Sequence, residues 1–395
     1  MSNRMRNGLT VFMLVLLAVS AFVGGYLTRE LTGVRRDAYA QQDMSLFWEA
    51  WGHIQDSFIG EIPATTDITY GAIRGSLGAL DDPYTVFIEP AARDVERESL
   101  QGSFGGIGAY IRRDAETGEV SLDPIPGNPA EAAGILAGDI LLAVDGDPIP
   151  PEFTVPEIAD LIKGETGTVV TLTLQRPGED ESFDVEVVRG DILLPSVVYQ
   201  LLEADPTIGY INLSRFSGES GQEVGNALND LIDQGATRFI LDLRQNGGGL
   251  RDAAVQVADH FLDGGPVLYL DSRDGGERVY EATSETLVPD APLVVLVDSG
   301  TASASEIVAG ALQDRQRATL IGSKTFGKGS VQLVYDLSDG SSVHVTSARW
   351  LTPNHNQIDQ TGLEPDIPVE ITQEAIDNGQ DPALESAIEF LQTAQ

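Results

Sequence analysis

Residues 293–312 read LVVLVDSGTASASEIVAGAL. The stretch opens with a continuous apolar run, Leu293–Val297, of the kind that forms a strand buried on both faces. Helical character follows from Ala304 to Leu312. The sequence therefore predicts a buried strand that turns directly into a helix, with Ser303 at the turn. Free N–H groups and the positive end of the helix dipole at such a turn would stabilise an oxyanion.

A second segment, residues 325–332, reads TFGKGSVQ and offers a base for that serine. A serine hydroxyl is a poor nucleophile unless a neighbour removes its proton. Lys328 is such a base only if burial lowers its pKa well below the ordinary value of about 10.4. We expect Phe326 to supply an apolar wall and Gln332 to hold the amine without adding a charge. The alternative is a helix-capping Ser303 and a solvated lysine.

The two segments resemble those of the carboxy-terminal processing peptidases, also called tail-specific proteases. In that family the nucleophile and the lysine have the separation found here (328 − 303 = 25), which selects Ser303 over Ser305. The family pattern often continues with a glutamine, here Gln332. The resemblance runs from about Met44 to the C-terminus. Further segments that carry it are Leu80–Tyr84, the Gly-rich stretch near Gly105, Leu241–Arg244 and Gly362–Asp366.

The resemblance implies a multidomain α/β and α+β protein with a PDZ domain and a crotonase-like α/β serine protease core. The expected parts are a signal-anchor or transmembrane segment at 1–30, a linker at 31–43, a helical region at 44–101, the PDZ domain at 102–190, the protease core at 191–372 and a C-terminal helical segment at 373–395. In the family the helical region helps to pack or dimerise the enzyme, and a homo-oligomer is left open here. No metal or organic cofactor is implied.

Composition narrows the function classes. The chain of 395 residues carries 61 acidic and 24 basic side chains, an excess that argues against nucleic acid as a partner. A salt-rich habitat would also explain that excess. The absence of cysteine excludes a disulfide framework, a thiolate nucleophile and a Cys-ligated zinc site. The four histidines show no paired metal-ligand spacing and are expected to be structural or exposed.

The N-terminus carries an export signal. Residues 9–27 are almost uniformly apolar and follow Arg4 and Arg6, and at about 1.5 Å per residue they roughly cross a bilayer. The stretch is long for a cleaved signal peptide, and the small-residue pattern at 38–40 lies far downstream. The sequence favours a membrane anchor with the catalytic part outside the cytoplasm, periplasmic or at the cell surface. If the segment is cleaved, the protein is secreted.

The region from Ser45 to about Leu100 reads as helical. Apolar residues recur there at helical spacing, and we expect the first such stripe to form core rather than a ligand site. Its members are Leu46, Phe47, Ala50, Trp51 and Ile54.

Residues 102–190 resemble a PDZ domain. A Gly-rich stretch opens the segment, a short helix is expected at 129–134, and a strand ending in a tight turn at 138–146. PDZ domains bind an extended peptide as an added strand and hold its terminal carboxylate on backbone N–H groups. By that analogy the carboxylate is cradled by Gly106, Ile107, Gly108 and Ala109. The alternative is a PDZ domain that only packs on the protease. Lys163 stands where family members often have arginine, which weakens any role in carboxylate binding or domain linkage.

The segment beyond Ile192 alternates strands and helices. Strands are expected at 208–213 and 239–243 and helices at 222–234 and 383–391. The strand at 239–243 leads to three glycines, which free the backbone for close approach to a ligand. The resemblance assigns the oxyanion-hole N–H groups to Gly248 and Ala304. Gly247 replaces the usual proline, so we expect a looser turn.

The mechanism implied is peptide hydrolysis through an acyl-enzyme on Ser303, with neutral Lys328 as base. The expected partners are proteins or peptides with accessible C-termini, together with a membrane through the N-terminal segment. Two other readings stay open. One is a catalytically silent peptide-binding scaffold that works through its PDZ domain. The other is an acyl-CoA enzyme with a similar glycine oxyanion hole, which needs neither the PDZ domain nor the Ser–Lys pair.

Overall fold

The computed structural model describes residues 44–272, 275–284, 286–370, 372, 375 and 378–393. The chain divides into two compact units, with the boundary between Ile73 and Arg74. The anchor and linker expected at 1–43 lie outside the described residues. Among the helices that are described, none combines the length and the apolar character needed to cross a bilayer.

The described part of the first unit contains α2 (Ser45–Ser57) and most of α3 (Thr65–Gly78). The expectation that the apolar stripe of α2 forms core is wrong, because neither helix buries a residue. In that stripe Leu46 is 72% exposed and Ile54 is 43% exposed. The helical spacing was read correctly, but spacing alone does not show whether another element covers the face.

A strand interrupts the region that was expected to be helical up to Leu100. β1 (Val86–Ile88) pairs antiparallel with β18 (Ser342–Leu351), and Phe87 is buried. α4 (Pro90–Gln101) follows, with proline in its first turn and Gly102 in the left-handed conformation at its end. The pairing partner of β1 lies some 250 residues away along the chain, so local periodicity could not reveal it.

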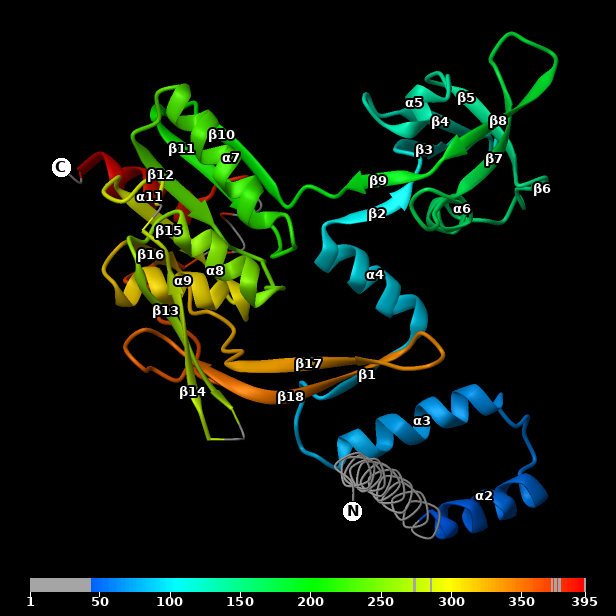
Figure 1. Ribbon diagram of the computed structural model, residues 1–395, viewed down its shortest axis with the longest axis horizontal. Helices are drawn as coiled ribbons and strands as arrows, with labels where there is room; N and C mark the ends of the chain where they lie inside the picture. Colours follow the sequence, from blue (N-terminus) through cyan, green and yellow to red (C-terminus); the bar gives the residue numbers. More distant parts are fainter. Residues whose placement is uncertain are drawn as a thin grey trace, which may run out of the picture. The chain divides into compact units, whose positions relative to one another are not determined.

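The segment expected to be a PDZ domain forms a small sheet of its own with two short helices (Figure 1). Leu122, Ile158 and Leu172 are fully buried in its core. Its strands are β3 (Ala109–Arg113), β4 (Val120–Pro124), β5 (Asp139–Val144), β6 (Asp147–Pro148), β7 (Val169–Gln175) and β8 (Ser182–Val188), and its helices are α5 (Pro129–Ala132) and α6 (Val155–Ile162). A two-stranded ribbon of β2 (Ser103–Gly106) and β9 (Gly190–Leu193) flanks it.

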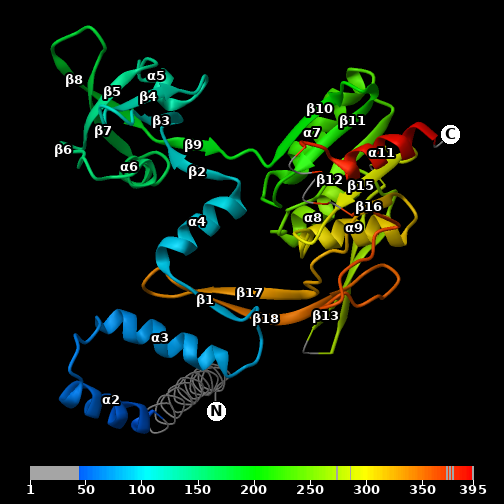
Figure 2. The same cartoon turned by 180° about the vertical axis from the view of Figure 1, so that it is seen from behind.

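The core sheet has the order β10-β11-β12-β15-β16-β19 and is parallel except for the β10–β11 pair. Helices cover both of its faces (Figures 1 and 2). Along β15, Val295 and Val297 pack in the core formed with α7, α8 and α9, whereas Val294 and Leu296 pack in the core formed with α11. This alternation explains the continuous apolar run. The bounds are β10 (Val197–Leu202), β11 (Asp205–Leu213), β12 (Arg238–Asp242), β15 (Leu293–Val297), β16 (Thr319–Gly322), β19 (Ile367–Pro368), α7 (Ser220–Asp233), α8 (Arg251–Asp259), α9 (Ala304–Asp314) and α11 (Pro382–Thr393).

A second sheet contains β1, β18, β13 (Gly265–Ser272), β14 (Glu277–Ala282) and β17 (Ser330–Asp336). β18 pairs with β17 along one edge and with β1 and β13 along the other. β17 and β18 lie side by side in both views (Figures 1 and 2). β17 begins two residues after Lys328. The pairing of β17 with β18 therefore holds the C-terminal end of the lysine segment in place.

Candidate active site

Ser303 occupies the turn between β15 and α9, as the sequence predicts. It precedes the first residue of the helix and has φ 55° and ψ −116°. A positive φ at a residue with a Cβ is strained and is found where the surroundings hold it, often at functional sites. Thr301 is buried beside it and its hydroxyl is hydrogen-bonded to the N–H of Asp298. The turn thus presents a half-buried serine at the start of a buried helix.

Glu306 joins the serine turn to the lysine segment. Its side chain is fully buried, and Oε2 accepts hydrogen bonds from the backbone N–H groups of Ser303 and Lys328, each at 2.9 Å. Oε1 accepts bonds from the Thr325 hydroxyl at 2.6 Å and the Gly327 N–H at 2.8 Å. Sequence reasoning missed this residue. The available signal was the serine–glutamate spacing of a capping box.

Burial lowers the pKa of Lys328, the direction that a lysine base needs, while the carboxylates of Glu96 and Asp82 act in the opposite direction. The amine lies over the ring of Tyr84, with Nζ 5.2 Å from the ring centroid. Phe326, which was expected to wall the amine, is instead 55% exposed. The aromatic contact therefore comes from a segment more than 240 residues earlier in the chain.

Ser303 and Lys328 line the same cavity, which has a volume of about 580 Å³. No hydrogen bond joins the Ser303 hydroxyl to the Lys328 amine in this structure. Hydrogen bonds between catalytic groups often tighten only when substrate binds. Gln332 also lines the cavity, but its amide donates to the hydroxyls of Ser330 at 2.9 Å and Thr346 at 3.4 Å. Its role in holding the lysine stays a prediction.

The glycine turn after β12 lies against the serine turn. A Cβ atom at Gly248 would lie 2.8 Å from the carbonyl oxygen of Ala302 and 2.9 Å from the nitrogen of Ala304. The φ angle of Gly248 is 101°. Only glycine fits at that position. The Ala304 N–H has no acceptor among the described residues. The Gly248 N–H donates to Oδ1 of Asn246 at 2.9 Å. The structure thus brings the two expected oxyanion donors together, with one of them engaged.

Asn246 fixes that approach and was missed by sequence reasoning. Its carbonyl oxygen accepts hydrogen bonds from the Ala302 N–H at 3.0 Å and the Ser305 hydroxyl at 2.8 Å. Its side-chain amide donates to the carbonyl of Leu213 at 2.7 Å. Ser305, the competing nucleophile, is fully buried with its hydroxyl committed to this bond. The accessible hydroxyl of the motif is therefore that of Ser303.

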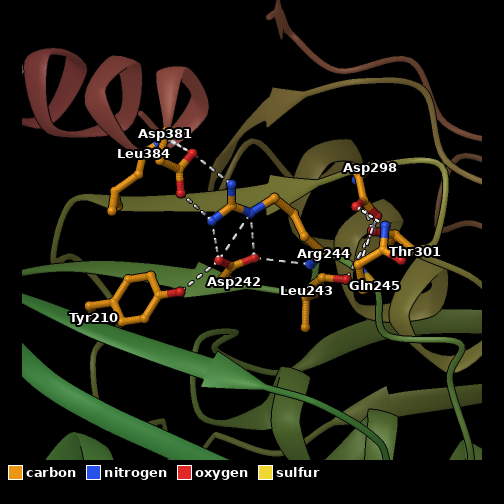
Figure 3. A network of polar contacts seen from close by, with 9 residues as sticks. All are labelled: Tyr210, Asp242, Leu243, Arg244, Gln245, Asp298, Thr301, Asp381 and Leu384. Carbon is orange, nitrogen blue, oxygen red and sulfur yellow. Dashed lines mark hydrogen bonds and ion pairs between the residues drawn. The ribbon is translucent and has the colours of Figure 1, made fainter. Parts of the chain in front are cut away.

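Charged groups anchor the end of β12 to the C-terminal helix (Figure 3). Arg244 binds Asp381 at the start of α11 through two hydrogen bonds of 2.7 and 2.8 Å, and it contacts Asp242 at 2.6 Å. Burial acts to lower the pKa of Arg244, but Asp242 and Asp381 raise it on balance. The Tyr210 hydroxyl donates to Asp242, and burial and that carboxylate raise the pKa of the phenol. These contacts hold Arg244, which lies two residues after the end of β12, at the start of the glycine turn.

The predicted PDZ groove is a cavity of about 320 Å³ lined mostly by apolar side chains. Ile107 and Gly108 connect β2 to β3, and their N–H groups have no acceptor within the described part of the chain. Gly108 has φ 69°, and a Cβ atom there would clash with the side chain of Asn128. Lys163 lines the same groove, pairs with Glu98 of α4 at 2.8 Å and lies over the ring of Phe104.

Comparison with known proteins decides the family. Residues 207–369 match the family described as Peptidase family S41, and residues 120–176 match the PDZ domain. A carboxyl-terminal-processing protease of Picosynechococcus sp. is 41% identical over 330 residues, covering 83% of this chain and 79% of that protein. The chain belongs to the carboxyl-terminal-processing protease family. Members of this family are serine-type peptidases, and this one carries a PDZ domain.

Two other proteins are similar to this carboxyl-terminal-processing protease. The chloroplastic C-terminal processing peptidase of Tetradesmus obliquus is 36% identical over 343 residues, covering 83% of this chain and 74% of that protein. The solved structure of a photosystem II D1 C-terminal processing protease is 36% identical and covers 81% of this chain and 86% of that chain, with a TM-score of 0.46. Among the residues described here, no group of three or more His, Cys, Asp or Glu side chains is placed to hold a metal.

Replacing the shared carboxylate should weaken the fold of the site. In Glu306→Gln one oxygen becomes an NH₂ group that faces at least one backbone N–H, so at least one of the four hydrogen bonds is lost inside the protein and the charge that strengthens the others is removed. We expect the free energy of unfolding to fall by about 2–4 kcal/mol. Urea unfolding monitored by the fluorescence of the buried Trp350 would measure the change.

The matched control is Glu364→Gln, which alters an exposed carboxylate that pairs with Lys324. Its effect should be small because exposed ion pairs contribute little. Equal effects of the two substitutions would contradict the stabilising role of the Glu306 carboxylate.

Proposed function

We propose that this protease is a serine endopeptidase that captures substrate C-termini on its PDZ domain and hydrolyses peptide bonds with a Ser303–Lys328 dyad through an acyl-enzyme. One observation carries the proposal. Ser303 and Lys328 line one cavity, and the same buried carboxylate, that of Glu306, binds the backbone of both. Burial also lowers the pKa of the lysine. A hydroxyl nucleophile and a lysine able to lose its proton thus face one space.

The reaction follows from these groups. Neutral Lys328 takes the proton from the Ser303 hydroxyl as the oxygen attacks the scissile carbonyl. The Ala304 N–H binds the oxyanion, joined by the Gly248 N–H once it leaves Asn246. Protonated Lys328 gives its proton to the leaving amine, which breaks the C–N bond and leaves the acyl group on Ser303. The lysine then takes a proton from water as the hydroxide attacks the acyl carbonyl. The ester C–O bond breaks to release the acid, and Lys328 returns the proton to the Ser303 oxygen. Gln332 positions the water or the amine.

The PDZ groove supplies tail specificity in this proposal. The backbone N–H groups from Gly106 to Ala109 bind the terminal carboxylate, and Ile107 and its apolar neighbours bind the last side chain. The N–H groups of Ile107 and Gly108, which have no acceptor among the residues that the structure describes, support this assignment. A tail held there raises the local concentration of the same chain at the dyad.

We further propose the chain organisation and the location expected from sequence. The boundaries are 1–30 for a membrane anchor, 31–43 for a linker, 44–101 for the helical region, 102–190 for the PDZ domain, 191–372 for the core and 373–395 for the C-terminal helical segment. The apolar run at 9–27 supports an anchor with the catalytic part outside the cytoplasm, periplasmic or at the cell surface. Assembly as a homo-oligomer is left open.

A second function fits two features of the site. The Ser303 hydroxyl does not hydrogen-bond to the Lys328 amine, and the Gly248 N–H is engaged by Asn246. Both features suit a silent scaffold that binds tails through its PDZ domain and never cleaves them. A cleavage assay separates this function from that of a peptidase.

Removing either member of the dyad should abolish cleavage of a peptide with a free C-terminus. We expect Ser303→Ala and Lys328→Ala to lower kcat at least about 10³-fold, because the nucleophile or its base is then missing. The matched control is Ser305→Ala, which removes a buried hydroxyl next to the nucleophile and leaves Ser303 in place. Cleavage by both dyad variants at the wild-type rate would contradict a catalytic role for Ser303 and Lys328. Binding of tails without any cleavage by the wild type would establish the scaffold.

The pH profile should show a lysine base. The neutral amine is the active form, so kcat/KM rises with pH as Lys328 loses its proton, beginning below the range of an ordinary lysine because burial lowers its pKa. Glu96→Gln removes a carboxylate that favours the protonated amine and should move the rise to lower pH. Asp94→Asn, an exposed change on the same helix, should not move it. A rate that rises toward acid would contradict the assignment.

Capture of the tail carboxylate is tested on the substrate. Amidating the C-terminus of a peptide removes its charge and should raise KM at least about 10-fold, because hydrogen bonds from the N–H groups to a charged acceptor are lost. The kcat should stay near its original value, since the dyad is untouched. Acetylating the N-terminus of the same peptide is the control. Equal KM values for the acid and the amide would mean that the PDZ domain does not read the carboxylate.

A further inference from the structure

β17 presents an unpaired edge. One of its edges pairs with β18 from Ser330 to Asp336. No strand among the described residues pairs with its other edge. In an antiparallel pair, alternate residues direct their N–H and C=O groups away from the partner strand. β17 therefore carries backbone donors and acceptors that face outward.

The same edge is apolar and exposed. Leu333 is 50% exposed, Val334 is 40% exposed and Tyr335 is 54% exposed. Proteins commonly protect free edges with charged residues, proline or short strands, because an exposed apolar edge pairs with any extended chain. These three residues include no charge and no proline, and the nearest charge of the strand is Asp336 at its end, which pairs with Arg93. Such an edge is suited to accept another strand.

This edge continues into the catalytic cavity. Five successive residues of the strand, Ser330–Val334, line the cavity that holds Ser303 and Lys328. Successive side chains of a strand point to opposite faces, so a cavity that meets five in a row meets the edge of the strand. Residues 247–250 of the glycine turn line the same cavity, and a Cβ atom at Gly247 would meet nothing within 4 Å. The cavity therefore has room beside the glycine turn for an extended polypeptide.

We propose that the open edge of β17, residues 330–334, binds the substrate segment around the scissile bond as an added β-strand. The occupant is the substrate main chain, because the edge and the nucleophile share one cavity. Backbone hydrogen bonds hold the segment and place its carbonyl at Ser303, while Leu333 and Val334 contact apolar side chains. The inference rests on the proposed function. It adds a second site of substrate recognition, which is separate from the C-terminal tail and depends mainly on the substrate backbone and little on its sequence.

A backbone N-methyl scan tests strand addition on the wild-type enzyme. A series of peptides keeps one sequence and one free tail, and each carries a single N-methyl group at one residue near the scissile bond, away from the tail. Methylation at every second residue should lower kcat/KM about 10-fold by removing a donor to β17, and methylation at the residues between should have little effect. A flat response, or one without the two-residue period, would overturn the proposal.

Two adjacent proline variants provide the matched pair on the protein. In Leu333→Pro and Val334→Pro one lost N–H faces β18 and the other faces the open edge. The variant whose thermal unfolding matches the wild type should lose about 10-fold in kcat/KM on the unmodified peptide. For this variant, kcat/KM should fall little further when the peptide is N-methylated at the residue that pairs with the substituted position. If both variants unfold, the N-methyl scan alone decides.

A small fluorophosphonate separates failure of this inference from failure of the proposed function. It phosphonylates a reactive serine with loss of fluoride and does not need an extended chain, so labelling of Ser303 should be equal in the wild type and the edge variant. If the wild type is neither labelled nor cleaves peptide, the dyad itself fails, and strand addition fails with it. If it is labelled and cleaves but the scan is flat, only strand addition fails. A flat scan with an oligomer that dissociates in Leu333→Lys would assign the edge to a second copy of the chain and overturn the proposal.

Discussion

The assembly of the site depends on the buried carboxylate of Glu306. A charge taken out of water costs free energy unless its oxygens are hydrogen-bonded, and here four donors satisfy it. The donors belong to the serine turn and to the lysine segment, which are separated along the chain. Glu306 can be buried at low cost only when both segments are in place. Correct folding of the core and correct assembly of the site are thereby the same event.

The acid–base balance of the site is set by groups on separate elements. Burial lowers the pKa of Lys328, and Glu96 and Asp82 counteract it. Glu96 lies on α4, the helix whose Glu98 pairs with Lys163 at the rim of the PDZ groove. One helix therefore bears both a carboxylate that acts on the pKa of Lys328 and an ion pair with the PDZ domain.

The local sequence pattern correctly predicted the helix, strand and turn that position the site. The strand at 293–297, the helix after Ser303 and the glycine turn follow from hydrophobic runs and glycine content, and the structure has them. The pattern failed where the deciding partner is remote. β1 is a strand because of β18, the stripe of α2 is exposed because no described element covers it, and Tyr84 takes the position expected of Phe326. Asn246 and Glu306 were missed because polar residues show their role only through their partners.

The bond from the Gly248 N–H to Asn246 bears on how the oxyanion hole would work. Hydrogen bonds to a charged acceptor are roughly twice as strong as those to a neutral one. A neutral substrate carbonyl would gain little by displacing the Asn246 oxygen, whereas a developing oxyanion would gain much. If Gly248 is the donor, the exchange favours the transition state over the bound substrate, which is the condition for a binding interaction to accelerate the reaction. Ala304, whose N–H has no acceptor among the described residues, would bind both states, so the two donors would have different roles.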